Sequence, residues 1–300
     1  MHVLSCELLA DGRMAKVRLS AGEKTFIIHG VQDGLRTDGR SCDAFRPMEL
    51  ECGVVSNTSG SARLRLSNTD ILVGVKAEMG KPRPTRPGEG YVEFFIDLSA
   101  NASPEFEGRG GEELATEIAN TLSSTYDLTS VLDYTSLCVL PEQCCWVLYV
   151  DVVVLECGGN LFDAIGIAVK AALYNTRIPK VKVQDGEGQE EIEVSDDPHD
   201  VVLLDTSNMP VLVTVSKVGQ QHVVDATLEE EACCLACIVM AVNPKGALVG
   251  MEKKGASSLT LNSIQDMITT GKKVGMNLNS NLSSVLQEIG QNTSSTGLLS

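Results

Sequence analysis

The residues with the clearest chemical potential are two adjacent glycines, Gly158 and Gly159, within the segment LECGGNLFDAIGIAVKAAL at residues 155–173. A glycine turn that enters a helix can aim backbone N–H groups at an anion, assisted by the positive end of the helix dipole. A working phosphate site also needs Thr, Ser, Arg or Lys beside the turn, but the next residues here are Asn160 and Leu161. The chemistry therefore favours a structural turn over a phosphate site.

A second cluster, CCLAC at residues 233–237, contains two cysteines, Cys234 and Cys237, with the spacing of a metal-binding pair. A structural zinc site needs four ligands, but the nearest histidine is His222 and no second cysteine pair lies at a fitting distance. The apolar neighbours favour packing, and we expect no metal, no cofactor and no catalytic residue. A metal or redox protein centred on Cys233, Cys234 and Cys237 stays an alternative.

Basic residues gather between residues 63 and 86, although the whole chain carries a formal net charge of −16. Such an excess of acids opposes nucleic-acid binding through the whole surface, because phosphate affinity comes from clustered Lys and Arg. Any RNA contact must therefore be local or shared with a basic partner. The Pro- and Gly-rich loop at residues 80–90 exposes several of these cations, and a solvated loop on an acidic protein is the competing interpretation.

Hydrophobic periodicity indicates the elements that position these residues. It predicts two strands within 60–79, strands at 91–98 and 211–215, a strand covered on both faces at 144–156, and a hairpin within 235–251. Helical spacing predicts a helix that begins near Gly111, a helix capped by Asn160, and two closing helices, one at 261–268 and one at 282–286. Runs of strands followed by paired helices are typical of two sandwiched α+β units.

Composition limits the class of protein. The 300 residues, of which 43% are apolar, suffice for one large or two ordinary domains. The uncharged stretch at residues 232–244 is shorter than the roughly 20 apolar residues that cross a bilayer. Acids at Glu7 and Asp11 interrupt the first apolar residues, so we expect no secretory signal, a location inside the cell, and reduced cysteines.

The acidic segment at residues 185–197 holds seven acids and no base, which is typical of a solvated connection. We therefore expect the domain boundary there. The predicted organisation is an N-terminal extension at 1–30, a first domain at 31–184, an acidic linker at 185–197, a second domain at 198–289 and a flexible tail at 290–300.

Five segments, in order along the chain, together resemble the ribonuclease PH family. They are DGLRTDGR (33–40), GSARLRLSNTDILVGVKAE (60–78), SPEFEGRGGEE (103–113), WVLYVDVVVLECGGNLFDAIGIAVKAAL (146–173) and HVVDATLEEEA (222–232). Within that family, Asp163 and Ala164 after GGNLF resemble the branch of exosome ring subunits called the ribosomal-RNA-processing protein 42 type. The resemblance implies an α+β, ribonuclease PH-like fold of two βαβα-type layers with mixed sheets, and a six-membered ring around an RNA channel.

The resemblance also implies where catalysis has been lost. Family enzymes cleave RNA with inorganic phosphate, and their glycine turn continues with Thr and Arg that hold the phosphate, where this chain has Asn160 and Leu161. They place an Asp for metal and proton work directly before a Met, where this chain has Asn208 before Met209. Asn carries no charge to hold Mg²⁺ or to exchange a proton at neutral pH. The degenerate former site comprises Gly158, Gly159, Asn160, Leu161 and Asn208.

The function implied is a noncatalytic structural subunit of the RNA exosome core, which lines the channel and supports 3′–5′ RNA processing and degradation. The implied partners are other ribonuclease PH-like subunits, RNA-binding cap subunits, an associated exoribonuclease and single-stranded RNA, with no membrane; the implied locations are nucleus, nucleolus and cytoplasm. The alternative is a phosphate-dependent 3′–5′ exoribonuclease whose site is shared with a ring neighbour. The candidate RNA-binding residues are Arg63, Arg65, Lys81, Arg83, Arg86 and Arg109.

Overall fold

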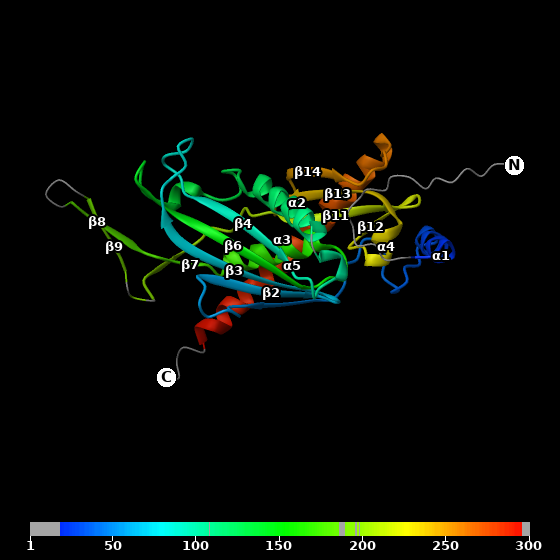
Figure 1. The fold of residues 1–300 in the computed structure, drawn as a ribbon, viewed down its shortest axis with the longest axis horizontal. Coiled ribbons are helices and arrows are strands. Elements are labelled where there is room, and N and C mark those ends of the chain that lie inside the picture. The colour runs from blue at the N-terminus through cyan, green and yellow to red at the C-terminus, as the bar shows by residue number, and fades with distance from the viewer. Residues whose placement is uncertain (1–18, 108, 186–189, 196, 198, 296–300) are drawn as a thin grey trace.

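The computed structural model describes residues 19–107, 109–185, 190–195, 197 and 199–295, which form a stack of sheets and helices (Figure 1). The first sheet has the strand order β1-β2-β3-β6-β4, with β5 beside β6. Its strands are β1 (Met48–Cys52), β2 (Gly60–Leu66), β3 (Thr69–Gly80), β4 (Tyr91–Leu98), β5 (Cys138–Leu140) and β6 (Cys144–Glu156). Because β4 and β6 are parallel and the other pairs are antiparallel, the sheet is mixed.

The second sheet has the order β12-β11-β13-β14. Its strands are β11 (Val211–Val218), β12 (Gln221–Val224), β13 (Cys234–Val242) and β14 (Leu248–Lys254). The helices are α1 (Ala21–Gln32), α2 (Arg109–Tyr126), α3 (Leu161–Tyr174), α4 (Leu228–Cys233) and α5 (Leu261–Ser295), with 3₁₀ turns at Pro104–Phe106 and Tyr134–Leu137. This combination of mixed and antiparallel sheets with separate helices confirms the predicted α+β class. In the described part of the chain, no helix combines the length and apolar character required to cross a membrane.

Helix α3 lies between the two sheets and is buried along nearly its whole length, from Leu161 to Leu173. It contacts β2 and β3 on one side and β11 on the other. At Gly166 an added Cβ would lie 2.9 Å from Cγ of Leu212 on β11, so glycine allows the helix to approach the second sheet closely. The N-terminus of α3 is therefore fixed relative to both sheets, and the glycine turn precedes it directly.

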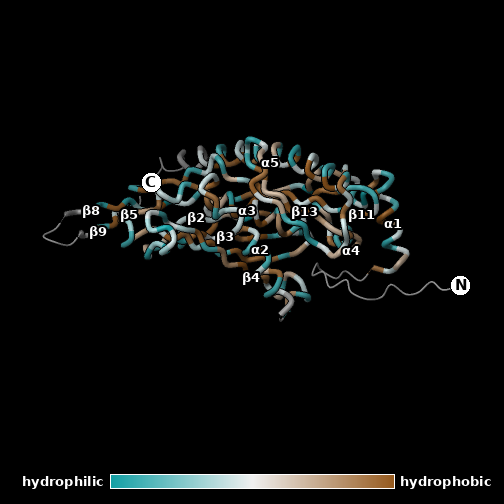
Figure 2. The backbone as a smooth tube through the Cα atoms, turned by 90° about the horizontal axis from the view of Figure 1, so that it is seen from above, coloured by the Kyte–Doolittle hydropathy of each residue, from teal (hydrophilic) through white to brown (hydrophobic). Residues whose placement is uncertain are grey.

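Helix α2 covers β4, where the rings of Tyr126 and Phe94 have centroids 5.4 Å apart. Helix α5 lies along the outer side of the stack, against β11 and β13 (Figure 2). Helix α1 packs through Ile27 and Val31 against a small separate cluster that includes Val218 and Val223. It begins within the predicted N-terminal extension, whose residues 1–18 lie outside the described part of the chain.

The prediction of two closing helices is wrong, because residues 261–295 form the single helix α5. Gly271 and Gly275 interrupt the apolar pattern between the two predicted segments, but here they allow close packing rather than a break. An added Cβ at Gly271 would lie 2.1 Å from Cε of Met240, and one at Gly275 would lie 2.7 Å from Cβ of Val242. The helix also includes residues 290–295 of the predicted flexible tail, whose last five residues lie outside the described part.

The predicted strands at 91–98 and 144–156 coincide with β4 and β6, and the predicted hairpin at 235–251 corresponds to β13 and β14. The expectation that residues 144–156 are covered on both faces is wrong. Tyr149 and Val153 are half-buried and Asp151 is exposed, whereas the alternate residues are buried. Helices α2 and α3 cover only the inner face of the first sheet, and its apolar outer positions lie on an open face.

The acidic segment forms a hairpin, β8 (Val181–Asp185) paired antiparallel with β9 (Glu190–Val194). This hairpin projects from one end of the molecule, opposite the end at which α1 lies (Figure 1). The short strands β7 (Arg177–Pro179) and β10 (Val201–Leu203) pair beneath it. The segment thus connects the two sheets as a protruding hairpin outside the core, and the domain limits drawn there stay a prediction.

Candidate functional site

The glycine turn lies where the two sheets approach each other, between β6 and α3. Gly159 and Asn160 have φ angles of +93° and +55°, so both lie in the left-handed region. An added Cβ at Gly158 would lie 2.8 Å from Cβ of Asn68, in the turn between β2 and β3. One at Gly159 would lie 2.8 Å from the carbonyl oxygen of Ala226, which follows β12. The glycines are thus required by protein packed on both sides of the turn.

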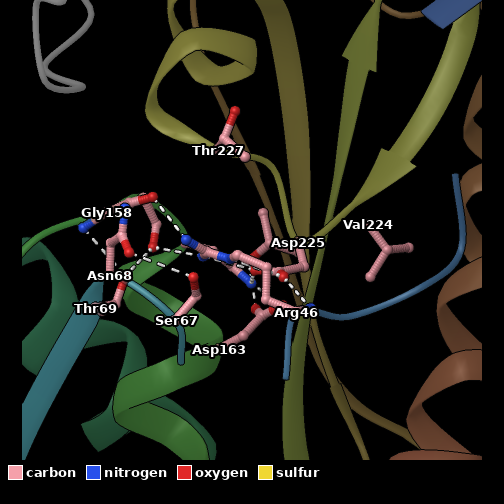
Figure 3. Close-up of polar contacts among 12 residues, drawn as sticks. Arg46, Ser67, Asn68, Thr69, Gly158, Asp163, Val224, Asp225 and Thr227 are labelled. Atoms are coloured by element: carbon pink, nitrogen blue, oxygen red, sulfur yellow. Dashed lines mark hydrogen bonds and ion pairs between the residues drawn. The ribbon is translucent and has the colours of Figure 1, made fainter. Parts of the chain in front are cut away.

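The polar atoms of the turn are occupied by other parts of the chain. Arg46 donates from Nη1 to the carbonyl of Gly158 at 2.7 Å and from Nη2 to that of Gly159 at 3.1 Å. The N–H of Gly158 donates to Oγ1 of Thr69 at 3.1 Å, and this hydroxyl donates to the carbonyl of Gly159 at 2.9 Å. Figure 3 shows Arg46 between Gly158 on one side and Asp225 on the other. The turn is therefore a fixed structural element.

The position of an incoming anion is taken by a carboxylate of the chain itself. The backbone N–H of Asn160, at the start of α3, donates to Oε1 of Glu231 at 2.7 Å. Glu231 belongs to α4, which follows the second sheet. Burial raises the pKa of the Glu231 carboxyl to about 7, although the hydrogen bond from Asn160 acts in the opposite direction. A phosphate bound to the Asn160 amide would have to displace Glu231.

The side chain of Asn160 joins two buried carboxylates. Its Nδ2 donates to Oδ2 of Asp163 at 3.1 Å and to Oδ1 of Asp225 at 2.8 Å. Asn160 occupies the N-cap position of α3, but its side chain makes no capping hydrogen bond, so the predicted capping role is wrong. Burial raises the pKa of Asp163 to about 7, against the hydrogen bond that Oγ1 of Thr214 donates at 2.6 Å. An amide that donates to both acids is suited to this position.

Asp225 is the centre of the surrounding charges. Arg46 donates to it from Nε at 3.0 Å and from Nη2 at 2.8 Å, and Arg40 donates from Nη1 at 2.8 Å. Burial opposes ionisation of Asp225, but the hydrogen bonds and the charge of Arg46 outweigh it, so its pKa lies below the ordinary value. Arg36 makes a two-point pair with Glu230, at 2.9 and 2.6 Å, and both side chains are almost completely buried.

These side chains form one arginine–carboxylate cluster, defined as Arg36, Arg40, Arg46, Asn160, Asp163, Asp225, Glu230 and Glu231. It ties the segment before β1 to the N-terminus of α3 and to the end of the second sheet. Sequence reasoning missed most of it, because it treated 33–40 and 222–232 only as segments of resemblance. The available signal was the capping box in which Thr227 and Glu230 begin α4, opposite three arginines within residues 36–46.

Two members of the degenerate former site, Leu161 and Asn208, take no part in this cluster. Leu161 is 8% exposed and belongs to the core. Asn208 is exposed, and within the described residues no hydrogen bond or ion pair joins it to the glycine turn. The adjoining carbonyl of Met209 accepts from Nζ of Lys170, inside α3, at 2.7 Å. Of the five predicted residues, the structure brings the two glycines, Asn160 and Leu161 together and leaves Asn208 separate.

Five of the six candidate RNA-binding residues fall into two groups at opposite ends of β3, whose twelve residues span roughly 35 Å. Arg63 and Arg65 share the carboxylate of Asp70, and the two-point pair from Arg63 has distances of 3.0 and 2.6 Å. At the other end, Lys81 is exposed, and Arg83 and Arg86 line a pocket. Arg109 begins α2, but its side chain lies outside the described part.

The cysteines of the CCLAC segment lie mostly in the core. Cys233 and Cys237 are buried, and Cys234 is half-buried and donates from Sγ to the carbonyl of Ala236 at 3.3 Å. A thiol hydrogen bond from Cys237 lowers the pKa of Cys234 to about 7, and the same bond raises that of Cys237. Over the described ranges, no group of three or more His, Cys, Asp or Glu side chains is arranged to hold a metal ion.

Comparison with known proteins identifies the family. The model of the 3′ exoribonuclease family matches residues 44–179 with its first domain and residues 208–274 with its second. The protein named exosome complex exonuclease RRP42 in Dictyostelium discoideum is 34% identical, over 91% of this chain and 99% of its own length. The exosome complex component Rrp42 of Methanopyrus kandleri is 34% identical, over 82% of this chain and 90% of its own length.

Two solved structures have the same fold. The Archaeoglobus fulgidus exosome with RNA bound to the active site contains a chain with a TM-score of 0.75 and 27% identity, which covers 86% of this chain and 97% of its own. A chain of an archaeal exosome core has a TM-score of 0.73 and 25% identity, with 87% and 96% covered. The predicted likeness to exosome ring subunits of the ribosomal-RNA-processing protein 42 type is confirmed. The chain belongs to the ribonuclease PH family of 3′ exoribonucleases.

Proposed function

We propose that this chain is a noncatalytic structural subunit of the exosome core ring. In this role it lines the RNA channel, binds neighbouring subunits and supports 3′–5′ RNA processing and degradation that other chains carry out. Its relatives in Methanopyrus kandleri and Pyrococcus furiosus are named exosome complex components, and its structural neighbours are archaeal exosome cores, one of them with bound RNA. The proposal is supported by coverage of almost the whole length of these relatives.

The observation that carries the noncatalytic role is the hydrogen bond from the N–H of Asn160 to Glu231, at 2.7 Å. Phosphorolysis requires a phosphate ion held beside the RNA 3′ end, and the amides at a helix N-terminus are a suitable donor group for it. Here a carboxylate accepts from that amide, and Arg46 is bonded to the turn carbonyls and to Asp225. A second negative ion in this position would meet repulsion and find no free cation in the arginine–carboxylate cluster.

The remaining residues of the degenerate former site support the same conclusion. Leu161 is buried in the core and has no donor to offer a phosphate. Asn208 is exposed and uncharged, so it cannot serve as an acid for Mg²⁺ or for proton transfer at neutral pH. The cluster instead joins the two sheets, which is the requirement for a rigid sector of a ring.

The test uses the ring assembled from its natural subunits, with single-stranded RNA, Mg²⁺ and inorganic phosphate. We expect Asn208→Ala to leave the release of nucleoside diphosphates unchanged, because the side chain is exposed and outside the cluster. The mass of the intact assembly serves as the control for incorporation of the variant. Nucleoside diphosphates that disappear in the Asn208→Ala ring would overturn the proposal and support the alternative, a phosphate-dependent exoribonuclease with a site shared with a neighbour.

The proposed partners are other ribonuclease PH-like subunits in a six-membered ring, RNA-binding cap subunits, an associated exoribonuclease and single-stranded RNA. The proposed locations are the nucleus, the nucleolus and the cytoplasm. The open outer face of the first sheet, where Phe95 is 52% exposed, offers apolar area for a protein neighbour. Mass measurement of the native assembly and microscopy of a fluorescent fusion test these two proposals, and a chain that purifies alone would contradict the first.

A further inference from the structure

Two cysteines face each other across neighbouring strands at one end of the first sheet. In the antiparallel ladder between β5 and β6, Cys138 lies directly opposite Cys145. Residues that oppose each other in such a ladder have Cα atoms about 4.5–5.5 Å apart, and their side chains project from the same face of the sheet. A disulfide joins residues whose Cα atoms are about 4.4–6.8 Å apart. The register therefore places this pair within disulfide range.

The neighbouring strands leave each of these thiols facing the other. On the other side of β6, Cys145 pairs with Gly80 of β3, which has no side chain. The ladder between β4 and β6 begins at Val147, so β5 takes the place beside Cys145. Among the described strands, Cys138 is thus the one residue with a side chain that lies directly opposite Cys145.

A third cysteine, Cys144, belongs to the same hairpin and differs in its geometry. Its partner in the ladder is Leu140 rather than a cysteine. Successive residues of a strand point to opposite faces of the sheet, so Cys144 points away from the face that Cys145 shares with Cys138. A disulfide needs Cβ atoms about 3.5–4.5 Å apart, which side chains on opposite faces do not provide. Cys144 is therefore a matched comparison for the opposed pair.

The two opposed thiols differ in their access to solvent, and this difference sets the order in which they react. Cys145 is 0% exposed, and burial raises the pKa of its thiol to about 11. Cys138 is half-buried. Because the thiolate is the form that attacks an oxidant, a buried thiol with a raised pKa reacts slowly. An oxidant in solution therefore meets Cys138 first, and Cys145 completes the bond.

We propose that Cys138 and Cys145, which are free thiols in this structure, form a reversible disulfide when the chain meets a hydroperoxide. The Cys138 thiolate attacks a peroxide oxygen and the O–O bond breaks, which gives a sulfenic acid at Cys138 and, after protonation, water or an alcohol. The sulfur of Cys145 then attacks that of Cys138, the S–O bond breaks, and the departing hydroxide takes up the Cys145 proton as water. The two thiols thus lose the two electrons that reduce the peroxide, and a dithiol reductant restores them by exchange.

The disulfide closes the eight-residue segment 138–145, which anchors the loop before β4. Within this segment, the N–H of Glu142 donates to the carbonyl of Pro87 at 2.8 Å. Just before it, the carbonyl of Tyr134 accepts from the N–H of Gly90 at 3.0 Å. A covalent link between the ends of a segment lowers the entropy of its open states. The oxidised hairpin therefore holds the loop more firmly than the reduced one. This inference does not depend on the proposed function.

The test adds hydrogen peroxide to the full-length chain, alkylates the remaining thiols, and cuts the chain after Glu142 without reduction. We expect the fragments on either side of Glu142 to stay joined, with a mass lower by two hydrogen atoms than the sum of the two thiol fragments, and to separate after reduction. Cys145→Ser should lose the joined product completely, whereas the matched control Cys144→Ser should keep it. Hydrogen exchange of the Glu142 amide reports the anchored loop, and we expect it to slow about tenfold in the oxidised chain.

The proposal is overturned if the wild-type chain gives no joined fragments at a peroxide dose that oxidises the exposed Met251. A joined product that persists in Cys145→Ser, or that disappears in Cys144→Ser, would assign the bond to another cysteine and also overturn it. Fragmentation of the joined peptides in the mass spectrometer locates the bond in the wild-type chain, so the assignment does not depend on the folding of a variant. An unchanged exchange rate of the Glu142 amide in the oxidised chain would refute the effect on the loop.

Discussion

The arginine–carboxylate cluster and the pocket beside Arg83 and Arg86 contain similar side chains but differ in how completely their polar atoms are hydrogen-bonded. In the cluster, charged residues from the segment before β1 and from the segment after β12 satisfy one another, and the Asn160 amide at the start of α3 is occupied by Glu231. In the pocket, two buried polar atoms lack partners although arginines lie nearby. The first region resembles an enzyme site in backbone shape but holds the fold together, whereas in the second the enclosed Oη of Tyr126 and Oε2 of Glu89 make no hydrogen bond. The shape of a turn is thus a weaker guide to binding than the state of its hydrogen bonds.

The largest expected effect tests whether the cluster holds the fold together. Arg36→Met leaves the buried Glu230 without its partner, and removal of one member of a buried ion pair costs about 3–5 kcal/mol. We expect the free energy of unfolding in urea to fall by that amount. The double variant Arg36→Met with Glu230→Leu removes both charges and should recover only part of the loss, because the carbonyls of Val224 and Asp225 still lose their donor and α4 loses its capping box. A decrease below 1 kcal/mol for Arg36→Met would show that the cluster contributes little to stability.

The next effect concerns pH. Burial raises the pKa of Glu231 to about 7, above its value in the unfolded chain, so folding favours the protonated form. The contribution of Glu231 to the free energy of unfolding is fully present below its pKa in the unfolded chain and is lost as pH rises through about 7. We therefore expect Glu231→Gln, which keeps an acceptor for Asn160, to be more stable than wild type at pH 8 by about 1–2 kcal/mol and to differ little at pH 4. Urea unfolding at both pH values measures this; a variant less stable at pH 8 would contradict it.

A smaller effect separates the two regions. Tyr134→Phe removes a buried hydrogen bond to the carbonyl of Tyr126, so we expect a loss of about 1 kcal/mol. Tyr126→Phe removes a hydroxyl that has no partner in the free protein, so stability should stay equal or rise. Thermal and urea unfolding of both variants check the difference. Equal losses would mean that the Tyr126 hydroxyl already has a partner, and the contrast between pocket and cluster would disappear.

The smallest effect is expected on the open face of the first sheet. Arg65 shares Asp70 with Arg63 and its side chain is 51% exposed. Exposed ion pairs contribute little, so Arg65→Ala should change the free energy of unfolding by less than about 0.5 kcal/mol. Measured beside Arg36→Met, this variant shows how the loss in free energy of unfolding differs between an exposed and a buried arginine. A loss of several kcal/mol would show that the outer face is more tightly organised than its exposure indicates.

Local patterns in the sequence were sufficient for elements that depend on near neighbours. Strands β4 and β6, the β13–β14 hairpin and the glycine turn before α3 follow from alternation and turn residues. The sequence of helix α5 predicts two helices because the close contacts of Gly271 and Gly275 with the second sheet are not visible in it. The open face of β6 was missed because apolar residues lie on both of its faces.

The site was only partly predictable from the sequence, because several of its contacts join distant parts of the chain. Asn160 and Leu161 were found because they follow the glycines, and their types already favoured a structural turn. Glu231 lies 71 residues further along the chain, so its bond to the Asn160 amide depends on how the second sheet packs. The unpartnered atoms of Tyr126 and Glu89 depend on the fold of a loop and a helix together, and no local pattern reports them.

The most direct measurement of the central claim follows the backbone amide of Asn160 by NMR in the full-length chain during titration with inorganic phosphate. Because this N–H donates to Glu231, we predict that its resonance does not move, whereas in Glu231→Ala the vacated position allows phosphate to shift it. A saturable shift of this resonance in the wild-type chain would contradict the account, since it would mean that the glycine turn still binds the attacking ion.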